Sequence, residues 1–199
     1  RTMRRSTCVC LRRRGNEMED ESPISKSLRP QTSSCAMSRS RAMKGGAEKR
    51  NEMEDKLQIR DMEAADVEAA SIIEREAFSM PWSAADFLEM VEADYASYYV
   101  AELNGEIVGC CGIRRLADEG EITNVAVKAG YRKKGIAFSM MRHMLENAEK
   151  NGIGDCTLEV RVSNYPAIKL YEKLGFKGEG VRPKFYERPA EDALIMWKR

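Results

Sequence analysis

Residues 121–137 read E-I-T-N-V-A-V-K-A-G-Y-R-K-K-G-I-A and combine a predicted strand, a basic loop and the start of a helix. A strand-like apolar run passes into a basic loop, and a helix is predicted to begin near Gly135. The first N–H groups of a helix have no partner within it, and its dipole favours negative charge there. Gly135 and Ala137 would let an anion approach the backbone closely. Taken alone, the pattern indicates either a phosphate-binding helix start or a solvated basic turn. It matches neither the Walker loop nor G-x-G-x-x-G.

A second stretch, residues 158–176, reads L-E-V-R-V-S-N-Y-P-A-I-K-L-Y-E-K-L-G-F and predicts a strand, a turn and a helix. Glu159 alternates with apolar neighbours, so its carboxylate belongs either to the polar face of a strand or to a reactive site. Tyr171 lies among apolar residues of the helix, so its ring belongs either to the core or to a site that uses the phenol. The two residues alone leave both alternatives open.

The flanking sequence predicts an α/β (α+β) fold, with a mixed, mostly antiparallel sheet flanked by helices and a central β-α-β crossover. Ser83 with Asp86 is a plausible cap for the second helix, and Asn104-Gly105 is typical of a hairpin turn. Glu74 interrupts the apolar stripe of the first helix. Strands are predicted at residues 57–60, 98–103, 107–113, 121–127, 155–162, 177–182 and 194–198, and helices at 64–78, 83–91, 135–151 and 166–174.

Charge divides the chain of 199 residues into two parts. Residues 1–52 hold 13 Lys or Arg and 6 Asp or Glu, whereas residues 53–199 hold 20 and 26, so a basic tail precedes an acidic domain. The tail shows no sustained apolar period and is expected to be disordered. Three interpretations remain open: an organelle transit peptide, upstream sequence translated before a true start at Met43 or Met53, and a segment that contacts RNA.

Composition excludes several classes of protein. No apolar run approaches the ~18 residues of a membrane-spanning helix, so we expect no membrane span. The formal net charge of +1 argues against direct nucleic-acid binding by the whole chain. No C-x-x-C pair occurs, so we expect no zinc or other metal site. Adjacent Cys110 and Cys111 are interpreted as buried thiols of a reducing, cytoplasmic compartment.

The two quoted stretches together resemble the GNAT acetyltransferase superfamily. The loop fits the acetyl-CoA signature [QR]-x-x-G-x-[GA], and residues 163–176 fit S-N-x-x-A-x-x-L-Y-x-x-x-G-F. Within the superfamily the chain is most similar to the bacterial ribosomal-protein-alanine N-acetyltransferases of the RimI type, and the likeness spans about residues 57–199. Three features carry this similarity: Pro81-Trp82-Ser83, the strand L-E-V-R at residues 158–161, and Tyr186 before E-D-A at residues 191–193.

The resemblance implies a role for particular residues. Glu159 would be the catalytic base and Tyr171 the catalytic acid, with acetyl-CoA as the cosubstrate and no metal. Pro81, Trp82 and Tyr186 would contact the substrate, although Trp82 could instead simply cover the first helix. The residues expected to bind the cofactor are Val125, Ala126, Val127, Arg132, Lys133, Lys134, Gly135, Ile136, Ala137, Phe138 and Asn164. The chain departs from the family pattern where Lys133 and Lys134 replace arginines and Ala137 replaces a glycine.

The function implied by the resemblance is acetylation of a protein N-terminus, most simply the N-terminal alanine of a small-subunit ribosomal protein. An acidic domain suits a basic ribosomal client. Two alternatives stay open on sequence grounds: a GNAT enzyme that acetylates lysine or a small-molecule amine, and a CoA-binding regulatory module without turnover.

Overall fold

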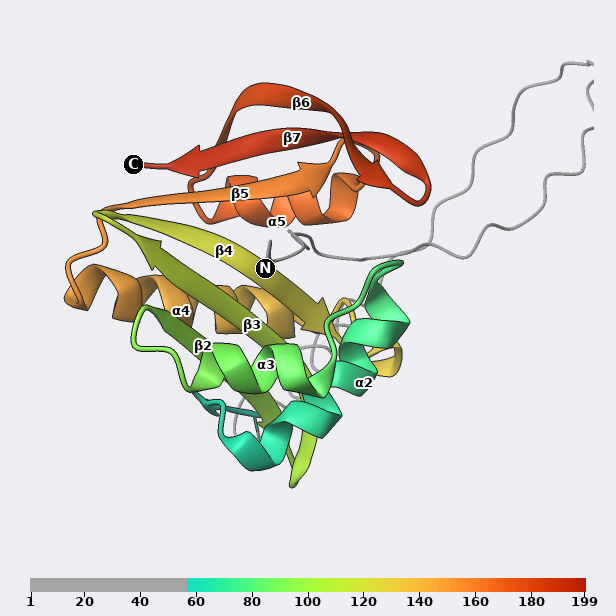
Figure 1. The fold of residues 1–199 in the computed structure, drawn as a ribbon, viewed down its shortest axis with the longest axis vertical. Coiled ribbons are helices and arrows are strands. Elements are labelled where there is room, and N and C mark those ends of the chain that lie inside the picture. Colours follow the sequence, from blue (N-terminus) through green and yellow to red (C-terminus); the bar gives the residue numbers. More distant parts are fainter. Residues whose placement is uncertain (1–56) are drawn as a thin grey trace, which may run out of the picture. The chain divides into compact units, whose positions relative to one another are not determined.

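The computed structural model describes residues 57–199. The expectations for the tail at residues 1–52 therefore lie outside the described residues. Within them, seven strands form one sheet in the order β1-β2-β3-β4-β5-β7-β6, in which only β4 and β5 run parallel. The strands are β1 (Leu57–Asp61), β2 (Ala96–Leu103), β3 (Glu106–Leu116), β4 (Glu119–Val127), β5 (Asp155–Arg161), β6 (Lys177–Glu187) and β7 (Ala190–Lys198). The predicted mixed, mostly antiparallel sheet is confirmed (Figure 1).

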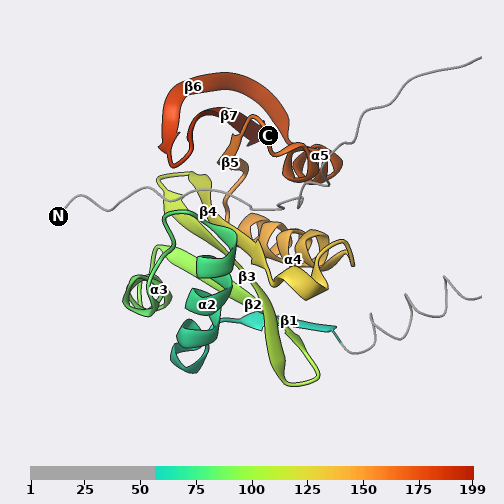
Figure 2. The same ribbon diagram turned by 90° about the vertical axis from the view of Figure 1, so that its right-hand side faces the viewer.

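Helices cover both faces of this sheet. Helices α2 and α3 lie on one face, whereas α4 and α5 lie on the other (Figure 2). The helices are α2 (Val67–Ala77), α3 (Ala84–Val91), α4 (Ile136–Lys150) and α5 (Tyr165–Lys173), with short 3-10 turns η1 (Ala64–Asp66) and η2 (Ala129–Tyr131). Because β3 is covered on both sides, Cys110 and Cys111 are both fully buried although they point to opposite faces.

Local sequence signals set the boundaries of these elements. The side chain of Ser83 accepts a hydrogen bond from the Asp86 backbone N–H, and the Asp86 carboxylate accepts one from the Ser83 backbone, as the predicted cap requires. Asn104 and Gly105 adopt φ angles of 55° and 81°, which confirms the hairpin turn. The two last strands are longer than predicted, because β6 continues past Arg182 through a register irregularity.

Strand β4 pairs with β3 along its whole length but with β5 only at its start. On one side it pairs with β3, and a bulge there leaves Thr123 opposite no residue, since Gly112 pairs with Asn124 and Ile113 with Ile122. On the other side it pairs with β5 only at residues 119–121. The two strands then diverge (Figure 1). Among the described residues, β4 therefore has no strand partner on that side from Ile122 onward.

Gly112 lies opposite this bulge in close contact with Tyr98. A Cβ at position 112 would come within 2.2 Å of the Tyr98 ring, which is itself packed in the core. No side chain can be added there without displacing the ring.

We predict that Gly112→Ala lowers the free energy of unfolding by about 1–3 kcal/mol, because the added methyl group overpacks the core. Urea unfolding of the purified protein measures this change. The matched control is Gly130→Ala, where a Cβ would meet no atom within 4 Å and the effect should stay within about 0.5 kcal/mol. Equal stability of the two variants would contradict the packing described here.

Candidate active site

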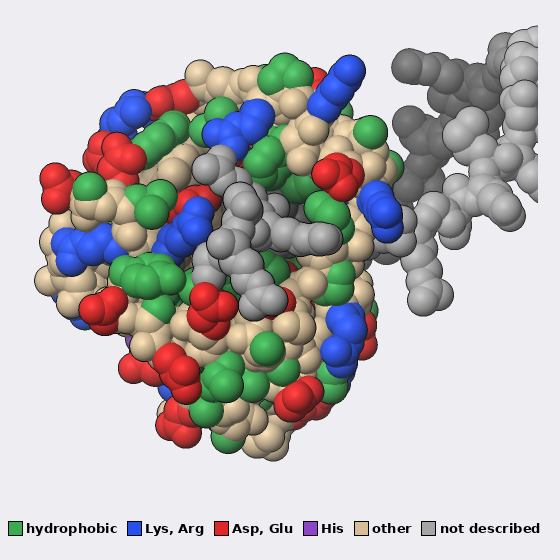
Figure 3. Space-filling model, in the orientation of Figure 1, with side chains coloured by type: hydrophobic (Ala, Val, Ile, Leu, Met, Phe, Trp, Pro, Cys, Tyr) green, Lys and Arg blue, Asp and Glu red, His purple; other side chains and the backbone are tan. Residues whose placement is uncertain are grey.

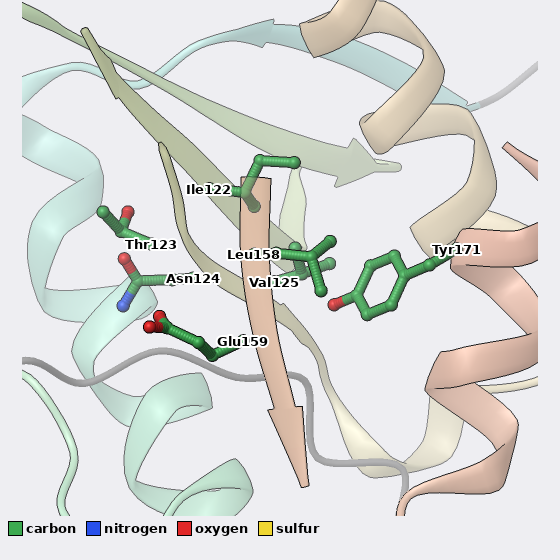
Figure 4. Close-up of a pocket in the computed structure, with 7 residues that line it drawn as sticks. All are labelled: Ile122, Thr123, Asn124, Val125, Leu158, Glu159 and Tyr171. Atoms are coloured by element: carbon green, nitrogen blue, oxygen red, sulfur yellow. The ribbon is translucent and has the colours of Figure 1, made fainter. Parts of the chain in front are cut away.

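A narrow pocket lies where β4 and β5 diverge (Figure 4). Its walls come from the two strands and from α5. The lining residues are Ile122, Thr123, Asn124, Val125, Leu158, Glu159 and Tyr171. The structure thus brings Glu159 and Tyr171, the two residues expected to be catalytic, to one pocket.

Glu159 lies on β5 and is 8% exposed. Its carboxylate pairs with the Arg182 guanidinium of β6, with Oε1 and Nη1 2.8 Å apart. The Tyr186 hydroxyl donates a hydrogen bond to the backbone carbonyl of Glu159 at 3.2 Å. Tyr186, expected to contact substrate, is therefore adjacent to the expected base. Arg182 was not predicted, because no local pattern shows that β6 brings it to Glu159.

Tyr171 extends from α5 into the pocket and is 1% exposed. Its ring packs against Phe176, with the ring centroids 5.9 Å apart. The hydroxyl points toward Leu158 and Val125, and it lies on the opposite side of β5 from the Glu159 carboxylate (Figure 4). The two alternatives for Tyr171 are thus not exclusive, since the ring is buried while its hydroxyl reaches the pocket.

The part of β4 that diverges from β5 is its last segment, which leads into the loop before α4. Val125, Ala126 and Val127 are all buried, and their side toward β5 lacks a strand partner. Arg132, expected to supply charge, donates a hydrogen bond from Nε to the Val127 carbonyl at 2.8 Å. This contact ties the loop before α4 to the end of β4.

Helix α4 begins without a side-chain cap. Gly135 occupies the cap position with a φ of 85°, and a Cβ there would meet no atom within 4 Å. Lys133 and Lys134 are exposed beside it, Ile136 is buried, and Ala137 is half-buried. Phe138 is also half-buried and carries Lys173 Nζ 4.5 Å from its ring centre. The predicted helix start is confirmed, and its open backbone and basic side chains can hold an anion.

The remaining predicted residues lie on two other segments. Asn164 caps α5, where its Oδ1 accepts a hydrogen bond from the Ala167 backbone at 3.4 Å. Pro81 is exposed, whereas Trp82 is half-buried. The Trp82 ring centroid lies 5.5 Å from that of Phe87 and 6.0 Å from that of Tyr98. Trp82 therefore packs against α3 and β2, whereas Pro81 beside it is exposed.

Glu74 is a buried carboxyl group of α2 that the sequence marked only as an interruption of an apolar stripe. Its side chain is fully buried, and Oε1 accepts a hydrogen bond from Asn124 Nδ2 at 2.9 Å. Burial raises the pKa of Glu74 from 4.5 to about 8, and the Asn124 amide and the Trp82 backbone N–H offset part of this increase. A neutral carboxylic acid therefore lies directly behind the pocket wall at neutral pH.

Two further features bear on the chemistry. Among residues 57–199, no group of three His, Cys, Asp or Glu side chains could hold a metal ion. Within the same residues, every helix is too short or too polar to cross a membrane.

Comparison with known proteins shows what this chain is similar to. The Acetyltransferase (GNAT) family matches residues 67–176. A Bacillus subtilis relative, provisionally named a ribosomal protein bS18-alanine N-acetyltransferase, is 38% identical over 146 residues, which cover 73% of this chain and 97% of that protein. The crystal structure of the ribosomal-protein-S18-alanine N-acetyltransferase from Escherichia coli is 32% identical with a TM-score of 0.66, and the match covers 71% of this chain and 92% of that chain.

A third similarity concerns the fold alone. An N-acetyltransferase from Thermoplasma acidophilum, solved in complex with coenzyme A, is 19% identical with a TM-score of 0.62. The match covers 72% of this chain and 99% of that chain.

The raised pKa of Glu74 predicts how stability depends on pH. Between pH 4.5 and about 8 the folded protein holds a proton that the unfolded chain has lost, so this group's contribution to stability falls as pH rises. The slope is at most about 1.4 kcal/mol per pH unit. Glu74→Gln should flatten the curve of unfolding free energy against pH in this window, whereas the exposed control Glu172→Gln should not. A slope that persists in Glu74→Gln would show that Glu74 does not titrate as described.

Proposed function

Because the chain belongs to the acetyltransferase (GNAT) family, we propose that it acetylates the N-terminal α-amine of a protein, with an alanine-starting ribosomal protein as its client. The observation that carries this proposal is the pocket at the divergence of β4 and β5, which joins a carboxylate and a phenol from opposite sides. The names of the Bacillus subtilis and Escherichia coli relatives support this client class.

The described residues fit acetyl-CoA as the acetyl donor. The free edge of β4 at residues 125–127 can hydrogen-bond the pantetheine amides as an added strand would. The start of α4, with its uncapped N–H groups, Lys133 and Lys134, suits the pyrophosphate. In this proposal Ile136, Ala137 and Phe138 form the first turn behind it, and Asn164 contacts the cofactor from the start of α5. When bound, acetyl-CoA supplies the thioester that the amine attacks.

In the proposed mechanism Glu159 is the base. An α-amine has a pKa of about 8, so much of it is protonated at neutral pH and must lose a proton before attack. Glu159 accepts this proton through a bridging water. Its position is fixed by Arg182, which holds one carboxylate oxygen, and by Tyr186, which binds the backbone of the same residue.

Tyr171 is the acid in this scheme. Its hydroxyl donates a proton to the sulfur that leaves when the C–S bond breaks, and the phenolate regains a proton from the attacking nitrogen, which loses its second proton as the amide forms. Backbone N–H groups of the free β4 edge can stabilise the negative charge that develops on the acetyl oxygen. The amine attacks the thioester directly, so the mechanism needs no covalent intermediate on the protein.

In this proposal the polypeptide client meets the side of the pocket that carries Glu159. Tyr186 lies next to Glu159, and the Trp82 ring contacts Tyr98, whose hydroxyl reaches the pocket residues Thr123 and Asn124. Residues 53–199 carry a formal net charge of −6, which favours encounter with a basic protein. Figure 3 shows acidic and basic side chains interspersed on one face, so on that face the attraction is diffuse rather than confined to one patch. A cytoplasmic location is part of the same proposal.

The acetylated atom tests the proposed function. We expect a basic peptide that begins with alanine and contains an internal lysine to gain one acetyl group on its α-amine, as located by tandem mass spectrometry. The control is the same peptide with a blocked N-terminus, which should gain none. Acetylation of the lysine or of a small amine instead would favour the alternative GNAT substrates, and coenzyme A binding without any transfer would indicate a regulatory module.

Two substitutions test the assigned roles. Glu159→Gln and Tyr171→Phe should each lower kcat by about 10²–10⁴-fold, because each removes one proton transfer. Their affinity for coenzyme A, measured by calorimetry, should change little. Glu172→Gln and Tyr95→Phe are matched controls at exposed positions and should keep wild-type rates. Wild-type turnover in both site variants would show that the roles are assigned to the wrong residues.

A further inference from the structure

Glu74 requires an explanation that packing does not supply. It lies on the face of α2 that packs in the core. Its Oε2 atom is buried and makes no hydrogen bond to any residue that the structure describes. A buried polar atom left in this way costs about 1–3 kcal/mol. An apolar side chain of similar volume would fill the same space without this cost.

Glu74 belongs to a buried hydrogen-bond network with Asn124, Tyr98 and Thr123 behind the pocket wall. Glu74 Oε1 accepts from Asn124 Nδ2 at 2.9 Å, and Asn124 Oδ1 accepts from the Tyr98 hydroxyl at 3.2 Å. The Tyr98 ring lies 6.0 Å from that of Trp82. The Trp82 ring also lies 5.5 Å from that of Phe87 on α3. Glu74 thus connects α2 to β4 directly, and the contacts reach Trp82 only through Asn124 and Tyr98.

The same hydrogen-bond network includes the bulge of β4. The Tyr98 hydroxyl is 2.6 Å from Thr123 Oγ1, and this oxygen is also 3.3 Å from the Gly112 carbonyl, to which it donates. Thr123 is the extra residue of the bulge, and both Thr123 and Asn124 line the pocket. In Figure 4 their side chains lie on the same side of β5 as the Glu159 carboxylate. A displacement of Thr123 or Asn124 would therefore change the shape of the pocket beside the proposed base.

We propose that Glu74 is a positioning residue for acetyl transfer, which holds Asn124 and the bulged segment of β4 in place beside the pocket. This inference rests on the proposed function. Glu74 acts through the hydrogen bond that its Oε1 accepts, and it makes no contact with the reacting atoms. The ionisable groups that interact with it are Tyr98 and Cys110, and burial raises the pKa of both, so both are neutral at neutral pH. Neither group therefore carries a charge that would compete with Glu74 for the Asn124 amide.

The test compares two replacements of Glu74 with different hydrogen-bonding capacity. Glu74→Gln keeps an acceptor for Asn124, and we expect kcat and the KM values for acetyl-CoA and peptide to stay within about twofold of wild type. Glu74→Leu keeps the volume but removes the acceptor, and we expect kcat/KM per folded molecule to fall about tenfold or more, because small displacements of a site carry large kinetic costs. Ser71→Ala is the matched control, since Ser71 is equally buried on α2 but bonds only to Glu68 of its own helix.

A second variant covers the case in which Glu74→Leu does not fold. Tyr98→Phe retains the ring but removes the hydroxyl that joins Thr123 to Asn124, and it should show the same loss of kcat/KM. Wild-type kinetics in folded Glu74→Leu or in Tyr98→Phe would overturn the inference. An equal loss in Glu74→Gln would also overturn it, because the carboxyl group itself, rather than the accepted hydrogen bond, would then be required.

The wild-type protein separates this inference from the proposed function. Titration with coenzyme A and turnover of the alanine peptide are measured on it first. Wild-type protein without binding or turnover would refute the proposed function. Normal wild-type activity combined with unchanged Glu74→Leu kinetics would refute only the positioning role.

Discussion

The short pairing between β4 and β5 is the constraint on which the rest of the molecule depends. Three residue pairs hold the two strands together, and beyond them β4 keeps only its pairing with β3, which continues across the bulge at Thr123. A sheet edge in the middle of a protein would ordinarily be closed by the next strand, since unpaired backbone groups are costly to bury. Here the gap leaves backbone groups available to a ligand, and it admits Tyr171 from α5 and Glu159 from β5 to the same pocket.

Several tertiary contacts keep this gap in a fixed shape. Arg132 binds the end of β4 on one side of the gap, and Arg182 and Tyr186 hold Glu159 on the other. Behind β4, the buried Glu74 and Asn124 link the sheet to α2. The expected anion site at α4 differs in kind, because it depends on uncapped backbone N–H groups rather than on long-range side-chain contacts.

Features that depend on neighbouring residues could be predicted from the sequence. The Ser83 cap, the Asn104-Gly105 turn and the start of α4 follow from local chemistry, and the structure confirms them. The resemblance assigns catalytic roles to Glu159 and Tyr171; these roles stay a prediction, and the structure places both residues in the lining of one pocket. Contacts between residues far apart could not be predicted, because nothing in the sequence pairs Arg182 with Glu159 or Glu74 with Asn124, 50 positions away. Only the break in the apolar stripe of the first helix hinted at Glu74.

The placement of three cysteines has a consequence for the fate of the acetyl group. Thiolates exchange readily with thioesters, so a reactive thiol near the donor would carry the acetyl group to the protein itself. Cys110, Cys111 and Cys156 are all buried, and burial raises the pKa of each thiol, to about 11 for Cys156. At neutral pH these thiols stay protonated and out of reach while the sheet is intact. The domain can therefore handle a thioester without acylating the cysteines of its own core.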